Sequence, residues 1–447
     1  MGQKLAVLDY KPFRVTNRQV LAMAIPMMIA SLTTPLVGLV DAFVVGQFGD
    51  AALFGGLAAG AVVFDVIFVT FNFLRSGTFG LVAQAFGRSD DPEQQAVFLR
   101  AFVVAALSGV FLVLLTPLIA AAGEWLMNAE PAITAAMDIY IRVRLLSAPA
   151  ALINYAILGY LLGRGETGVA LLLQVVLNGV NIALSILLGI YLGWGVAGIA
   201  AGTTGAEVAT MIAGMLILIW RFRLMPRVSR RQTFDSAAIR CMFHLNGDII
   251  IRSFVLMGAY FIFMRQSAQL GTLTLAANAV LMHFLLFAEY FLGGISSAAQ
   301  QLVGRAIGAR DKTALLRAVR LTAGWGFAIA GFASILAFTL GDYFVYAITT
   351  AADVHAEAAF YFPWAVLTAP SGVLAFQMNG VFVGATWSRD MRDTMLLSFG
   401  VFITALFTFA QTFGNHGLWA AYHIFLLSRG ISLLLLLRRR VRIAFEE

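Results

Sequence analysis

Residues 81–90 read LVAQAFGRSD, and a similar stretch, LVGRAIGARD, occupies residues 302–311. The two stretches share Leu, Val, Ala, Gly and Asp at equivalent positions, and we call the offset from residue 81 to residue 302 the repeat spacing. A second pair, LAAGAVV at 57–63 and LAANAVL at 275–281, matches at five of seven positions with nearly the same offset. Two matches at nearly one spacing indicate that the second half of the chain is a copy of the first.

The composition is that of an integral membrane protein. Of 447 residues, 60% are hydrophobic and 12% are charged, and the mean hydropathy is +0.87, whereas soluble domains carry about 25% charged residues. The net charge of +7 does not indicate nucleic-acid binding, because the basic residues lie between apolar segments rather than on one globular face. The single cysteine, Cys241, excludes an internal disulfide.

Apolar segments follow one another along nearly the whole chain, and each is long enough to cross a bilayer as a helix of about 20 residues. Glycine, proline and charged clusters separate twelve of them, approximately 18–47, 52–84, 98–122, 133–161, 168–192, 195–220, 238–264, 273–303, 314–341, 355–384, 394–413 and 417–437. The sequence therefore predicts an all-α membrane protein with twelve transmembrane helices and no room for a soluble catalytic domain.

The repeat divides these helices into two six-helix lobes. We expect an N-terminal lobe over 1–220, a basic cytoplasmic linker over 221–237, and a C-terminal lobe with a basic tail over 238–447. Because six is even, both copies enter the membrane in the same sense, so a pseudo-two-fold axis along the membrane normal should relate them. Two like-oriented lobes around a cleft suit alternating access, which favours a monomeric transporter over a channel.

The distribution of basic residues predicts the orientation. On the side of the two termini, the loops and span ends carry 24 Lys and Arg residues, including Lys4 and Lys11, whereas the opposite loops carry only Arg265. Cytoplasmic loops are enriched in Lys and Arg. We therefore expect a multi-pass protein of the inner (cytoplasmic) membrane with both termini in the cytoplasm.

The apolar stretch TPLVGLVDAFVVGQFG, residues 34–49, contains Asp41 with no lysine or arginine within a helical turn. An Asp at the centre of a membrane helix costs about 2.5–3.5 kcal/mol, and an apolar environment disfavours the charged form of a carboxyl group. A carboxyl group that exchanges a proton is what a proton-coupled transporter needs. Pro35 should bend this helix, because it cannot donate to the helical ladder. A purely structural Asp41 is the alternative.

A polar stripe is predicted in the fifth span. Gln174, Asn178, Asn181 and Ser185 follow one another at spacings of four, three and four residues, which places them on one helix face. They are candidate partners of Asp41, or small polar residues that hold membrane helices together. Glu207, in the sixth span, is a second acid that could serve either purpose.

Asp65 and Arg75 lie ten residues apart in the second span, or about 15 Å along a straight helix, too far for a direct ion pair. Asp65 is a second candidate for proton coupling. We expect Arg75 to approach the cytoplasmic boundary and extend its charged end toward water.

The second half carries a different set of charged residues. Asp248 and Arg252 have the i, i+4 spacing of an ion pair within one helix, which we interpret as structural. Glu289 lies near the middle of the eighth span and is a further candidate for coupling.

The sequence contains no metal-ligand cluster, no nucleophile–base arrangement and no phosphate-binding G-x-x-x-x-G-K-[ST] motif. We therefore predict neither an enzyme nor an ATP-driven pump, and no cofactor or metal beyond a coupling ion.

Four stretches together resemble the multidrug and toxic compound extrusion (MATE) family, in particular its DinF-like branch. These are PLVGLVDAFVVGQFG, FNFLRSGTFGLVAQAFGRSD, NGDIIIRS and AAQQLVGRAIGARD. The resemblance implies a twelve-helix antiporter of two lobes, driven by protons or sodium, that exports organic cations and other amphiphiles. It also implies that Asp41 is the proton-linked acid and that Asn181 works beside it.

The chain departs from the family pattern where relatives carry further acids. Ser185 stands one turn after the asparagine, Leu292-Gly293-Gly294 replaces Leu-Asp-Gly in span 8, and Gln300 and Phe254 stand where other acids are expected. The absence of these acids favours protons over sodium as the coupling ion. Glu289 is one turn before Gly293 on the same helix face, so we hypothesise that it restores the missing carboxylate.

These observations predict a proton-coupled, less readily sodium-coupled, multidrug-type efflux antiporter for small amphiphilic or cationic substrates. Some of the 37 Phe and 16 Met residues should line a cleft that accepts apolar cations. The alternative is a flippase or exporter of lipid-linked precursors, which should carry arginines that face the central cleft and hold a pyrophosphate.

Overall fold

The computed structural model describes residues 13–226, 228–349 and 351–446, and all regular structure in these ranges is helical. In chain order the helices are α1 (Asn17–Gly46), α2 (Ala51–Phe71), α3 (Phe73–Gly87), α4 (Asp91–Leu114), α5 (Thr116–Met127), α6 (Pro131–Leu145), α7 (Ala148–Gly163), α8 (Thr167–Leu184), the π-helix η1 (Ser185–Tyr191), α9 (Gly195–Phe222), α10 (Arg230–Thr233), α11 (Ser236–Gln269), α12 (Thr272–Gly308), α13 (Lys312–Ile348), α14 (Ala352–Gly384) and α15 (Ser388–Glu446). Lys4, Lys11 and Arg227 of the predicted linker, which are among the 24 basic residues that predict the orientation, lie outside the described residues.

The predicted number of spans is confirmed. Within the described ranges, ten helices or helix pairs are long and apolar enough to cross a membrane, and α6 with α7 forms an eleventh span bent by 53°. The twelfth lies in α15, where Gly414, with φ 55° and ψ −129°, separates two helices. A Cβ at Gly417 would lie 2.0 Å from the Phe409 carbonyl oxygen, so the chain folds back on itself at this break.

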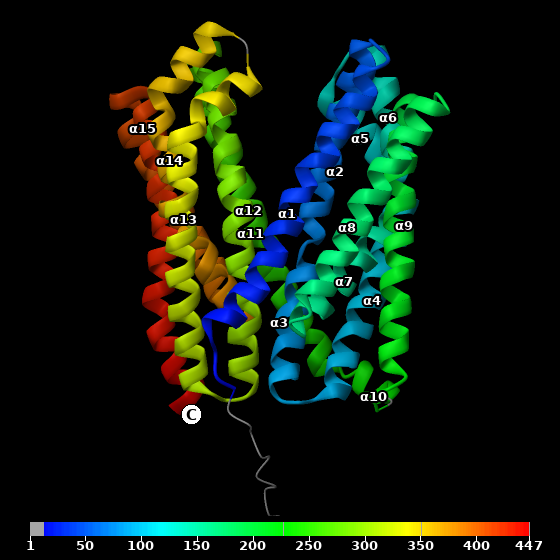
Figure 1. Cartoon of the computed structure of the whole chain (residues 1–447), viewed down its shortest axis with the longest axis vertical. Coiled ribbons are helices and arrows are strands. Elements are labelled where there is room, and N and C mark those ends of the chain that lie inside the picture. Colours follow the sequence, from blue (N-terminus) through cyan, green and yellow to red (C-terminus); the bar gives the residue numbers. More distant parts are fainter. Residues whose placement is uncertain (1–12, 227, 350, 447) are drawn as a thin grey trace, which may run out of the picture.

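The helices form two lobes, as predicted (Figure 1). The N-lobe comprises α2 to α9, and the C-lobe comprises α11 to α15. The first described residues and the C-terminus lie at the same end of the molecule, which we call the termini end. The ribbons of the two lobes meet toward this end and diverge toward the other.

The same turn occurs once in each lobe, at the positions that the repeat predicts. Ser89, after α3, has φ 54°, and Arg310, after α12, has φ 52°. The turns after α7 and α14 also match, because Gly165 has φ 77° and Thr386 has φ 57°. The members of both pairs are separated by the repeat spacing. Positive φ is uncommon outside glycine, so this agreement reflects a duplicated backbone.

The contact between the lobes is itself two-fold. A Cβ at Gly87 would lie 2.2 Å from the Arg305 carbonyl oxygen, and a Cβ at Gly308 would lie 2.0 Å from that of Gln84. The repeat spacing relates Gly87 to Gly308 and Gln84 to Arg305, so each lobe makes the contact that it receives. Glycine is required on both sides, because any larger residue would collide with backbone.

Helix α1 packs on both lobes. Val20 and Ala24, in its first half, belong to a buried cluster with α12 to α15, whereas Val44 and Val45 pack into the core of the N-lobe. Pro26 and Pro35 lie between these two parts. Pro26 leaves the Ala22 carbonyl without its helical donor, and the Thr167 hydroxyl of α8 donates to that oxygen at 3.1 Å.

Candidate functional site

Asp41 lies five residues before the end of α1, or about 8 Å from it, on the side away from the termini. Its carboxyl group is close to the Ser185 hydroxyl and within electrostatic reach of Arg144. One carboxyl oxygen, Oδ1, is buried and has no hydrogen-bond partner among the described residues. The structure therefore places this acid in the half of the helix that is remote from the termini end, beyond Pro35.

The predicted polar stripe lies on one face of α8. The Gln174 side chain donates to Asn178 at 3.2 Å, and the Ser185 hydroxyl donates to Asn181 at 3.4 Å. Asn178 in turn donates to the Thr33 hydroxyl of α1 at 2.7 Å. Asn178 therefore links α8 to α1, whereas Asn181 and Ser185 lie nearer to Asp41.

Helix α8 changes its winding at Ser185, the residue beside Asp41. The seven residues from Ser185 to Tyr191 form a π-helix, and π-helical turns are rare and frequently mark functional sites. Gly189 allows a close approach to α1 at this turn, because its Cβ would lie 2.6 Å from the Val44 side chain. Ser185 thus faces Asp41 from a distorted helical segment.

Arg144, which the sequence analysis did not single out, is the central cation of the N-lobe. It forms an ion pair with Glu207 at 2.9 Å between α6 and α9, with side chains 12% and 11% exposed. Its guanidinium group also lies 4.5 Å from the centre of the Phe64 ring. Glu207 therefore makes a contact between helices, one of its two predicted roles. Because Glu207 already neutralises Arg144, Asp41 is left without an ion-pair partner among the described residues.

Asp65 is exposed on α2, within electrostatic reach of Arg144 and of Tyr290 from the opposite lobe. Arg75 differs from the prediction. It lies twelve residues before the end of α3, about 18 Å along the helix, and faces Tyr155 of α7. Arg75 is therefore inside the lobe and does not reach the boundary.

The predicted ion pair between Asp248 and Arg252 is wrong. Asp248 accepts hydrogen bonds from the Ser388 hydroxyl at 2.6 Å and from Arg392 at 2.7 Å, both in the first turns of α15. Arg252 instead donates to Asn379 of α14. Residues four apart share a helix face only approximately, and here each side chain reaches a different neighbouring helix.

Glu289 points into the C-lobe, where Arg252 and Arg429 are within electrostatic reach of its carboxyl group. These arginines act on it at a distance, and no hydrogen bond joins its carboxyl group to a described residue. A Cβ added to Gly293, one turn after Glu289, would meet no atom within 4 Å. The position from which the family carboxylate is missing therefore borders open space, one turn from Glu289.

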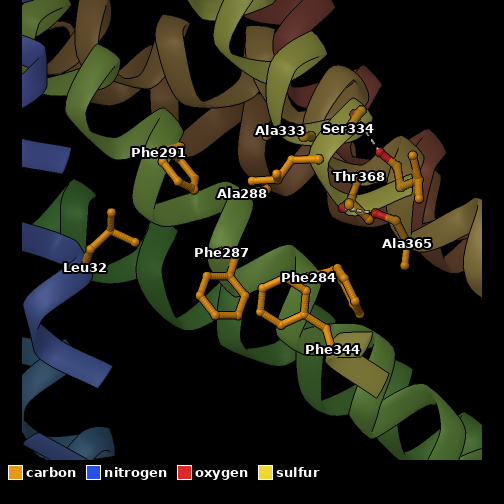
Figure 2. Close-up of a pocket in the computed structure, with 14 residues that line it drawn as sticks. Leu32, Phe284, Phe287, Ala288, Phe291, Ala333, Ser334, Phe344, Ala365 and Thr368 are labelled. Carbon is orange, nitrogen blue, oxygen red and sulfur yellow. Dashed lines mark hydrogen bonds between the residues drawn. The ribbon is translucent and has the colours of Figure 1, made fainter. Parts of the chain in front are cut away.

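An aromatic cavity of about 170 Å³ lies between α12, α13 and α14, and Leu32 of α1 closes one edge of it (Figure 2). Phe284, Phe287 and Phe291 project from one side of α12 toward it. The two hydroxyl groups in its wall are occupied: Ser334 donates to the Val366 carbonyl and Thr368 to that of Ala365. The cavity thus offers an apolar surface, lined by Phe but not by the expected Met.

Comparison with known proteins decides the family. The MatE family model matches residues 26–219 and 249–409, and these two ranges lie on either side of the basic linker. The chain belongs to the MATE family. It is therefore a multi-pass membrane transporter and not an enzyme. The DNA damage-inducible protein F of Escherichia coli (strain K12) is 33% identical over 94% of this chain and 92% of its own.

Two solved transporter structures have the same fold. A MOP superfamily transporter from Pyrococcus furiosus, whose binding pocket is described as reversed in polarity, superposes with a TM-score of 0.88 at 19% identity, over 96% of this chain and 97% of that one. An outward-facing multidrug resistance MATE transporter gives a TM-score of 0.87 at 19% identity, over 96% of each chain. At this identity the likeness concerns the fold alone.

The sequence contains a signal that Arg144 pairs with an acid from another helix. The segment YIRVRLL contains Arg142 and Arg144, and Asp138 is one turn before Arg142 only. The structure pairs Arg142 with Asp138 at 2.7 Å on the exposed side. Arg144 therefore needed an acid from another helix, and Glu207 was the unassigned acid of the same lobe.

Proposed function

We propose that this MATE transporter is a monomeric, proton-coupled efflux antiporter of the inner (cytoplasmic) membrane, with the termini end in the cytoplasm. Its substrates are small amphiphilic or cationic molecules. The positive-inside distribution of Lys and Arg supports this orientation. The ribbons of the two lobes meet at the termini end and diverge away from it, which in this orientation supports an outward-facing state.

The observation that carries the proposal is the state of Asp41. Glu207 occupies Arg144, and Asp41 keeps a buried oxygen without a partner among the described residues. A carboxyl group without a fixed counter-ion is free to gain or lose a proton, whereas one that is locked to an arginine would stay ionised.

The transport cycle follows from this chemistry. In the outward-facing state Asp41 takes up a proton from outside, its neutral form suits a drier site, α1 shifts, and the substrate leaves. After the return to the inward-facing state, a hydrated site favours release of the proton, and the next cation enters. Asn181 and Ser185 supply the hydrogen bonds that exchange with those of Asp41, and the aromatic cavity of the C-lobe accepts the apolar part of the substrate.

The test is efflux of a fluorescent amphiphilic cation from proteoliposomes with an imposed pH gradient. Asp41→Asn should reduce efflux to the rate of empty liposomes, because an amide cannot exchange a proton. Asp138→Asn is the matched control, since Asp138 is paired on the exposed side of α6, and it should retain wild-type efflux. Wild-type efflux by Asp41→Asn would refute the proposal. Efflux driven by a sodium gradient alone would show that the coupling ion is sodium and not the proton.

The same assay tests Glu289 as the substitute carboxylate of the second half. If Glu289→Gln leaves efflux and its pH dependence unchanged, Glu289 has no coupling role. The alternative, a flippase of lipid-linked precursors, predicts arginines that face the central cleft. Arg252 and Arg429 lie instead among α11, α14 and α15 of one lobe, so the antiporter is favoured.

A further inference from the structure

A second, much smaller cavity lies inside the C-lobe between α11, α14 and α15. Its polar lining consists of Arg252, Asn379, Thr394 and Arg429, and its remaining walls are apolar. The free space is about 10 Å³, which is close to the space needed by one water molecule. The two arginines therefore border a space for one small group.

Hydrogen-bond donors at this cavity lack acceptors. Arg429 is only 5% exposed, and its guanidinium group has no hydrogen-bond or ion-pair partner among the described residues, although the Phe425 ring lies 5.3 Å away. The Nε atom of Arg252 is buried without a partner in the same part of the chain. Arg252 donates to the Asn379 oxygen, so this oxygen is turned toward Arg252 and the NH₂ group of the same amide is a further donor.

The charges near the cavity do not balance. Glu289 is the carboxyl group that acts on both Arg252 and Arg429, so two cations face one acid. Asp248, one turn before Arg252, is already committed to Arg392 and Ser388. A buried charge without a counter-ion is strongly unfavourable, so the cluster favours one further negative charge.

We propose that this cavity is a binding site for one small monovalent anionic group, held by Arg252 and Arg429. The group is either a halide-sized inorganic ion or the carboxylate at the end of an amphiphile. The small volume excludes a pyrophosphate. Arginine is suited to the role because its guanidinium is always charged and presents several donors in a rigid plane. The inference concerns binding alone and does not depend on the coupling ion or on the direction of transport.

The first test measures thermal unfolding of the purified full chain as chloride replaces methanesulfonate, whose sulfonate group is bulkier than a halide or a carboxylate, at constant sodium and ionic strength. The unfolding temperature should rise with chloride and saturate. The saturable rise should disappear in Arg429→Gln and in Arg252→Gln. Arg142→Gln, which removes an arginine paired on the exposed side of α6, is the matched control and should respond like the wild type.

The second test adds a variant that changes the response in the opposite direction. Glu289→Gln removes the competing acid, so chloride should reach its half-maximal effect at a several-fold lower concentration. In crystals of the wild-type protein grown with bromide, anomalous scattering should place a bromide ion between the two guanidinium groups. These measurements remain informative if an arginine variant fails to fold.

The third test separates the two sources of the anion. If the anion is the carboxylate of an amphiphile, octanoate should stabilise the wild type at a lower concentration than acetate does. This difference between octanoate and acetate should be absent in Arg429→Gln. Equal effects of octanoate and acetate identify a free anion. The proposal is overturned if chloride acts alike on the wild type, both arginine variants and Glu289→Gln, or if no bromide lies at the cavity. Either outcome of the efflux test on Asp41→Asn would leave these results unchanged.

Discussion

The N-lobe and the C-lobe share a backbone plan but differ in charge. Gly159 packs on the Arg75 carbonyl in the first lobe, and Gly380 packs on the Ser296 carbonyl in the second. The repeat spacing relates the two glycines and likewise the two carbonyls, so the helix contact is the same in each copy. The side chains are not: an arginine of the N-lobe corresponds to a serine of the C-lobe.

The membrane-embedded acids and arginines of the two lobes also sum to net charges of opposite sign. Two acids of the N-lobe, Asp65 and Glu207, and the adjacent Asp41 of α1 lie against Arg75 and Arg144. The C-lobe holds Glu289 against Arg252 and Arg429. A helix contact at glycine has no space for an added atom, so both copies keep it. The polar residues can differ between the copies, provided that each lobe balances its own charge. The N-lobe does so with the Arg144–Glu207 ion pair and with acids in excess of arginines, and the C-lobe, in our proposal, with a bound anion.

The largest difference between the lobes should appear when each loses its acid. Glu207→Gln leaves Arg144 as a buried cation without its counter-ion, and breaking a buried pair in this way costs about 3–5 kcal/mol. Glu289→Gln removes an acid that acts on Arg252 and Arg429 without a direct hydrogen bond, and in chloride buffer the proposed anion still offsets part of their charge, so its effect should be smaller. Thermal unfolding of the two purified variants in chloride buffer measures the contrast.

The double variant Glu207→Gln/Arg144→Gln is the control for this contrast. It removes both charges, so it should recover much of the stability that Glu207→Gln loses. Equal destabilisation by Glu207→Gln and Glu289→Gln would show that the two lobes do not balance charge differently.

The fold could be predicted because its signals are local or repeated. Runs of about 20 apolar residues locate spans without any knowledge of neighbours, and the repeat spacing identified the duplication that the matched turns at Ser89 and Arg310 confirm. The polar stripe of the fifth span was predictable for the same reason, because the spacing within a single helix places its residues on one face.

The partners of charged residues could not be predicted, because they depend on which helices are neighbours. Asp248 and Arg252 satisfy the i, i+4 rule, but Arg392, which is distant in sequence, comes within 2.7 Å of Asp248. Arg144 and Glu207 meet only because α6 packs on α9. A residue spacing describes one helix, whereas an ion pair inside a bundle belongs to two.

A smaller effect is expected where the lobes are alike. Gly380→Ala would place a Cβ 2.1 Å from the Ser296 carbonyl oxygen, and Gly159→Ala would place one 2.6 Å from that of Arg75. Overpacking of this kind costs about 1–3 kcal/mol, so both variants should unfold at lower temperature, Gly380→Ala more so. Gly331→Ala, where nothing lies within 4 Å, should be neutral or gain up to about 1 kcal/mol from helix propensity. A stable Gly380→Ala beside an unstable Gly159→Ala would contradict the shared packing.

The smallest effect concerns α1, which joins the two lobes. Thr33→Val removes the acceptor of the 2.7 Å hydrogen bond from Asn178, which ties α1 to the N-lobe. Trp325→Phe removes the 3.2 Å bond to Asn17, which ties the start of α1 to the C-lobe. A neutral hydrogen bond contributes only about 1 kcal/mol net, so neither variant should unfold the protein.

Amide hydrogen exchange resolves where each loss acts. Thr33→Val should accelerate exchange in the part of α1 that follows Thr33, and Trp325→Phe should accelerate it in the first turns after Asn17. Thr70→Val is the control, because the exposed hydrogen bond of Thr70 goes only to the Val66 carbonyl of its own helix, and it should leave α1 unchanged. If either variant accelerates exchange along all of α1, the helix behaves as one rigid rod. In that case Pro26 and Pro35 do not divide it into a half for each lobe, and Asp41 cannot move independently of the C-lobe contact.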